Sequence, residues 1–87
     1  MDKGKWTCIH APLQAEGKLK NGNWWYFRAR HSAWTFTVGK TLEDAIDENH
    51  IFSVYSDYPN ASWMEKEVGK RIITGCIKLF LEEQDET

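Results

Sequence analysis

The sequence predicts an α+β fold, in which an antiparallel sheet of three or four strands is covered on one face by one long C-terminal helix. Three observations predict it. Residues 24–38 alternate as a β-hairpin does, residues 62–80 repeat apolar side chains at helical spacing, and turn signals separate the segments. A chain of 87 residues is of a size for one small domain, 1–87.

The N-terminal part is expected to be extended. A first strand is predicted over residues 5–9, and a further edge segment over residues 13–19. Pro12 has no amide hydrogen to donate to a ladder, which favours an edge or a bulge at this point. Asn21-Gly22 suits the positive φ angles of a tight hairpin. The segment should therefore fold back against a strand that begins at Trp24.

The next hairpin has a register that the side chains define. With His31-Ser32 at its tip, the facing pairs on one side are all apolar. These pairs are Ala29 with Trp34, Phe27 with Phe36 and Trp25 with Val38. An apolar face of this kind is what a sheet packs against a helix. The opposite face then carries Trp24, Tyr26, Arg28 and Arg30, with Thr35 and Thr37 beside them.

The C-terminal half predicts a short helix, a strand and a long helix, so the order is β-β-β-short α-β-α. Thr41 is the expected N-cap of the short helix, and residues 51–56 form the strand. Ser62 and Glu65 have capping-box spacing at the start of the long helix. One broad apolar stripe follows on that helix: Val68, Ile72, Ile73, Cys76, Ile77 and Phe80.

The charge is unevenly distributed along the chain. The net charge is −2, but residues 1–40 carry seven basic against two acidic side chains, and residues 41–87 carry four against eleven. Such an asymmetry steers charged partners. No apolar leader and no run long enough to cross a membrane is visible, and the two cysteines have no metal-knuckle spacing. We therefore expect a cytoplasmic protein with free thiols.

Two motifs resemble cofactor sites without meeting their requirements. Gly39-Lys40-Thr41 lies between a strand and a helix, but a phosphate-binding loop needs a glycine where this chain has Trp34. The triplet is better explained as a strand end followed by an N-cap. His10, His31 and His50 match no known ligand spacing with Cys8. We expect no cofactor and no bound metal.

A thiol site is the remaining catalytic hypothesis. Cys8 and His10 lie two residues apart on one strand, an arrangement that lowers a thiol pKa when the imidazole is oriented. No residue nearby in the sequence orients that imidazole, and packing explains Cys8 as well. Cys76 falls on the apolar stripe and is expected to be buried. We rank a small enzyme built on Cys8 and His10 third, and expect a protein that is not an enzyme.

The aromatic and basic face of the hairpin is the strongest candidate for function. Tryptophan, tyrosine and arginine are enriched in interface cores. The first hypothesis is therefore a protein–protein module, a homodimer or an accessory subunit, which binds through Trp24, Tyr26, Arg28 and Arg30. The second is a single-stranded nucleic-acid binder that uses the same four residues. A third explanation is structural, with the N-terminal segment, Trp6 or Trp63 covering the rings. The size suits a small bacterial or phage accessory protein.

Overall fold

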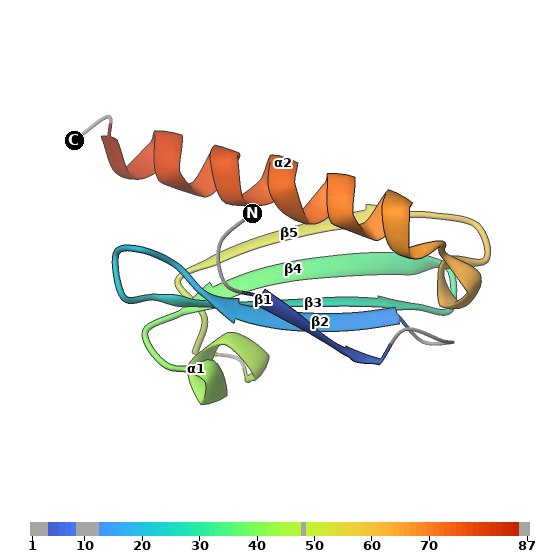
Figure 1. The fold of residues 1–87 in the computed structure, drawn as a ribbon, viewed down its shortest axis with the longest axis horizontal. Helices are drawn as coiled ribbons and strands as arrows, with labels where there is room; N and C mark the ends of the chain where they lie inside the picture. Colours follow the sequence, from blue (N-terminus) through green and yellow to red (C-terminus); the bar gives the residue numbers. More distant parts are fainter. Residues whose placement is uncertain (1–3, 9–12, 48, 86–87) are drawn as a thin grey trace.

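The computed structural model describes residues 4–8, 13–47 and 49–85, which form a sheet with helices on both faces. The elements in chain order are β1 (Gly4–Cys8), β2 (Leu13–Lys18), β3 (Trp24–Arg30), β4 (Ala33–Gly39), α1 (Leu42–Ile46), β5 (Phe52–Asp57), the 3₁₀ helix η1 (Ala61–Trp63) and α2 (Lys66–Asp85). The strands pair antiparallel in chain order from β1 to β5. The long helix α2 lies across one face and α1 against the other (Figure 1). The predicted α+β class is confirmed.

The N-terminal segment differs in detail from the prediction. It forms two paired strands, so the sheet of the described residues has five strands where three or four were expected. β2 pairs with β1 on one side and β3 on the other, and the expectation of an edge segment there is wrong. Pro12, which suggested an edge, lies outside the described residues. Within the described part of the chain, the free edges of the sheet belong to β1 and β5.

The two hairpin turns follow local chemistry. Between β2 and β3, the Gly22 amide donates to the Leu19 carbonyl oxygen at 3.0 Å, and the Leu19 amide donates to Asn23 at 2.7 Å. Of the Asn21-Gly22 pair only Gly22 has a positive φ, of 91°. This is the geometry of a three-residue loop closed by a left-handed glycine. Between β3 and β4, His31 has a φ of 59° at the tip.

The register of β3 and β4 is as predicted. Ala29 pairs with Trp34, Phe27 with Phe36 and Trp25 with Val38. Trp25, Phe27 and Phe36 are fully buried under α2. A chain of rings links the sheet to the helix, since Phe52 lies 6.5 Å from Phe36 and 5.1 Å from Phe80 between ring centroids. Each fully buried ring of this size stabilises the fold by roughly 1.5–3 kcal/mol.

The apolar stripe of α2 is also confirmed. Ile73, Cys76, Ile77 and Phe80 are buried, and Val68 and Ile72 are partly buried against the same core. Residues of this set recur at intervals of three and four, which places them on one side of a helix. α2 therefore seals the inner face of β3, where the largest rings lie.

The capping box predicted at Ser62 and Glu65 is wrong. Residues 61–63 form η1, and Met64 has an extended backbone with φ −56° and ψ 134°, so α2 begins only at Lys66. The Ser62 hydroxyl instead accepts a hydrogen bond from the His31 amide at 2.7 Å. The Ser62 hydroxyl, which was expected to cap the helix, therefore binds the tip of the β3–β4 hairpin instead. The Met64 side chain is buried in the core.

Candidate interaction face

The four predicted contact residues lie together on the face of β3 that points away from α2. Along β3 they alternate with buried Trp25, Phe27 and Ala29. Trp24, Tyr26 and Arg28 are partly buried, and Arg30 is exposed. We call this surface, with its neighbours Lys18, Glu16, Thr35 and Tyr55, the aromatic–basic face. The separation of the two sides of β3 predicted from the sequence is confirmed.

Cross-strand pairing places acidic as well as basic groups on this face. Tyr26 faces Glu16 on β2 and Thr37 on β4. Arg28 faces Gln14 and Thr35. The face therefore has mixed charge, although the residues on β3 alone are basic and aromatic.

Trp24 lies in the last row of the sheet and is partly covered. Lys18 is its partner on β2, and the Lys18 ammonium lies 5.7 Å from the centroid of the indole ring. A cation at this distance over tryptophan stabilises by about 0.5–1 kcal/mol at an exposed position. The contact holds the ring beside the sheet and covers part of its outer surface.

Arg28 is the polar centre of the aromatic–basic face. Its Nε atom is buried, and it has no hydrogen-bond partner among the described residues. A buried donor of this kind costs about 1–3 kcal/mol while it is unpaired. Pairing this donor would recover that energy, but an acceptor from outside reaches the Nε atom only if the Arg28 side chain moves.

Helix α1 covers one end of the face. The Thr37 hydroxyl donates to the carbonyl oxygen of Ala45, and Ala45 is fully buried. Thr41 accepts from the Asp44 amide at 3.1 Å, which confirms it as the N-cap. Gly39 lies directly beneath the helix, and a Cβ atom there would stand 2.4 Å from the Ala45 nitrogen. The triplet that begins at Gly39 is thus a strand end, a linking residue and a cap.

A shallow hollow adjoins α1 on the same side of the sheet. It has a volume of about 610 Å³ and is lined by Thr35 and Thr37 of β4 and by Ile46, Asp47, Asn49 and His50. Ile46 is 51% exposed at its rim. α1 therefore leaves part of the aromatic–basic face uncovered. Ile46 and Asp47, at the end of α1, add an apolar and an acidic group to the rim of the hollow.

Tyr55 is a residue of this surface that the sequence analysis missed. It faces Thr35 across the β4–β5 ladder, is 66% exposed, and its hydroxyl donates to the Asp57 carboxylate at 3.3 Å. The alternation of β5 was the signal, because Phe52 and Val54 pack inward and Tyr55 must then point outward. The face thus extends from β2 to β5.

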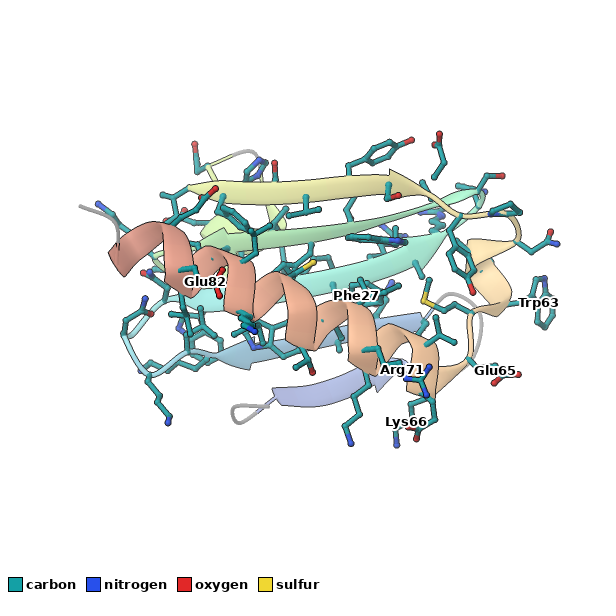
Figure 2. All side chains as sticks on the ribbon, turned by 90° about the horizontal axis from the view of Figure 1, so that it is seen from above. Phe27, Trp63, Glu65, Lys66, Arg71 and Glu82 are labelled. Carbon is teal, nitrogen blue, oxygen red and sulfur yellow. The ribbon has the colours of Figure 1, made fainter. Side chains whose placement is uncertain are left out.

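Trp63 does not cover the aromatic–basic face. It projects from η1 at one end of the molecule, and 78% of its surface is exposed (Figure 2). The side chain of Trp6 lies outside the part of the structure that is described. Among the described residues, the cover over this face is α1.

The titratable residues considered from the sequence are separated. His31 lies at the tip that begins β4, and His50 lies beyond its far end, where its Nδ1 is 3.1 Å from the Asp47 carbonyl oxygen. Seven residues of strand separate them by roughly 20 Å. No cluster of three metal-ligating side chains occurs in the described part of the chain. His10 and the side chain of Cys8 lie outside the described residues.

Cys76 is buried in the core, as expected. Removal from water raises the pKa of its thiol from 9.0 to about 11. Desolvation disfavours the thiolate, so this cysteine is a weak nucleophile at neutral pH.

Comparisons with family models, with curated proteins and with solved structures found no match to this chain. In the described ranges, no helix is both long enough and apolar enough to cross a membrane. The geometry of the aromatic–basic face is therefore the basis for a functional proposal.

Proposed function

We propose that the protein is a non-enzymatic binding module whose aromatic–basic face contacts another protein. The observation that carries the proposal is the state of Arg28. Its Nε atom is buried without a partner at the centre of a surface that α1 covers only at one end. Binding that turns the Arg28 side chain outward would let a backbone carbonyl or carboxylate oxygen of the partner accept from that donor.

The residue types around Arg28 suit such a contact. Trp24, Tyr26 and Tyr55 supply ring surface, and Arg30 supplies an exposed fork of donors. Residues that dominate binding energy in interfaces are enriched in tryptophan, tyrosine and arginine. The acidic side chains of Glu16 and Asp57 add acceptors at the border, as the polar rim of an interface does.

Single-stranded nucleic acid is the second candidate. Lys18, Arg28 and Arg30 beside aromatic rings favour it, because bases stack on rings while cations pair with phosphates. Glu16 shares the face with Tyr26, and Asp57 lies beside Tyr55. A phosphate backbone laid along this surface would meet these carboxylates, so we rank a protein partner first.

Site-specific photo-crosslinking tests the proposal. A benzophenone amino acid replaces exposed Arg30 on the face, or exposed Lys78 on the outer side of α2 as the matched control. After irradiation in an extract of the cells that express the protein, we expect a discrete protein adduct from position 30 only. Arg28→Glu and Trp24→Ala should abolish it. Equal adducts from both positions, or an adduct insensitive to both substitutions, would contradict the proposal.

An oligonucleotide titration separates the second candidate. Tryptophan fluorescence is followed while oligo-dT is added at low and at physiological salt. Nucleic-acid binding predicts quenching that weakens steeply with salt and is lost in Trp24→Ala. We expect no quenching at either salt concentration. Salt-sensitive quenching together with no protein adduct would replace the first candidate with the second.

A further inference from the structure

The outer edge of β5 is an open strand edge. β5 is the last strand of the sheet and pairs only with β4 among the described residues. Figure 2 shows it along the border of the sheet, beyond α2. An exposed edge presents a row of unpaired N–H and C=O groups, which is a template for a further strand.

Hydrogen bonding to β4 defines which groups face outward. The Tyr58 amide donates to the Ser32 carbonyl oxygen at 2.8 Å, which continues the register that pairs Asp57 with Ala33. In an antiparallel ladder the N–H and C=O of one residue point to the same side, and successive residues alternate. The backbone groups of Ser53, Tyr55 and Asp57 therefore point away from β4.

The edge lacks the features that commonly prevent pairing. β5 has the sequence FSVYSD, without lysine, arginine or proline, and its only charge is Asp57 at the end. Four of its six residues are exposed, and the exposed Tyr55 lies in the middle. Natural edge strands are protected by charge, proline or cover, so this strand has the properties of a pairing edge.

We propose that β5 pairs with β5 of a second copy of this chain, antiparallel and about a two-fold axis at Tyr55. The register of this pairing follows from the backbone N–H and C=O groups that point away from β4. With Tyr55 facing Tyr55, Ser53 of each copy faces Asp57 of the other, and every outward N–H and C=O of the three residues is paired. A shift by two residues toward the C-terminus brings Ser53 opposite Pro59, which has no amide hydrogen, and leaves pairs unmade.

The side chains are complementary in this register. Asp57 faces a serine hydroxyl that donates to it, and no carboxylate faces another. On the α2 side Val54 faces Ser56, so no charge is buried. Residues that face each other across an antiparallel ladder lie on the same side of the sheet. The aromatic–basic faces of both copies would therefore form one continuous surface.

This dimer is distinct from the proposed contact through Arg28, and the tests separate them. Sedimentation equilibrium should show an average mass that rises from that of the monomer to that of the dimer as the protein concentration is raised. Amide exchange by NMR should show Ser53, Tyr55 and Asp57 protected at high concentration and unprotected on dilution, while Val54 stays protected throughout. Arg28→Glu should leave the dimer unchanged. A monomer at millimolar concentration, or a dimer whose Tyr55 amide exchanges freely, would overturn the proposal.

Charge substitutions at Ser53 test the register itself. Ser53→Asp puts two carboxylates opposite each other at both symmetric contacts and should weaken the dimer about tenfold. Ser53→Lys provides an opposite charge at the same contacts and should strengthen it. Position 53 is exposed, so both variants should fold, which circular dichroism checks. Equal effects of the two substitutions would refute this register.

Discussion

The contact between Gly39 and α1 leads to a prediction about how the aromatic–basic face is built. Gly39→Ala adds one methyl group at the end of β4. That Cβ atom would lie 2.4 Å from the Ala45 nitrogen, 2.7 Å from the Asp44 carbonyl carbon and 2.8 Å from the Asp44 Cβ. None of these atoms is at the flexible end of a side chain, so α1 must move as a unit.

The cost has two parts. Overpacking at a tight contact destabilises by about 1–3 kcal/mol. Displacement of α1 also breaks the hydrogen bond from the Thr37 hydroxyl to Ala45, which contributes about 1 kcal/mol. We expect Gly39→Ala to lower the free energy of unfolding by about 2–4 kcal/mol, or the melting temperature by roughly 10–25 °C for a chain of this size.

The same substitution at Gly75 is the matched control. Gly75 is exposed on α2, and a Cβ atom there has no neighbour within 4 Å. Alanine is the better helix former, so Gly75→Ala should raise stability by about 0.5–1 kcal/mol. Thermal unfolding followed by circular dichroism measures both variants. If Gly39→Ala melts at the wild-type temperature, α1 does not rest on β4 as described and the explanation of the covered end is refuted.

Three further predictions follow from other contacts. Gly22→Ala should cost about 1–2 kcal/mol in urea unfolding, because a φ of 91° strains alanine although the space around it is empty. Ser62→Ala should cost about 1 kcal/mol and speed exchange of the His31 amide, since that donor loses its acceptor; unchanged exchange would contradict the contact. Burial raises the pKa of Cys76 to about 11, so the unfolded chain loses the thiol proton above pH 9.0 while the folded chain keeps it. The contribution of this pKa difference to the free energy of unfolding is complete below pH 9 and falls by roughly 2 kcal/mol as the pH rises to 11. Cys76→Ala should remove this part of the pH dependence of the free energy of unfolding.

Most of the structure of the β3–β4 hairpin and of the helices could be predicted from the sequence. Trp25 and Phe27 lie two residues apart, Phe36 lies between two threonines, and only one register brings the three rings to one face, so the pairing of β3 and β4 was predictable. The same holds for Thr41, whose cap depends on residues within one turn. Sequence patterns were enough to predict these features because the interactions that stabilise them are either between near neighbours in the chain or repeated along a strand.

Interactions between distant segments could not be read in this way. Ser62 has capping-box spacing, but a backbone amide 31 positions earlier takes its hydroxyl. The close approach of Ala45 to Gly39 depends on the path of the loop between them, which no periodicity reports. Of the candidate face, the sequence predicted the four residues on β3. It missed Tyr55, since the alternation of β5 indicates which side of that strand Tyr55 occupies, but only the pairing of β5 with β4 places it beside Thr35 on the same face.

The pairing of the strands in chain order has a consequence for how the protein forms during synthesis. Each strand meets its partner soon after it leaves the ribosome, because every pairing is between neighbours along the chain. Topologies dominated by short loops fold quickly. α2 follows all five strands, so the rings of β3 and β4 stay exposed to water until residues beyond Lys66 emerge. Until α2 docks, the inner face of the sheet therefore exposes large apolar side chains to water, a surface that makes a partly folded chain prone to aggregation.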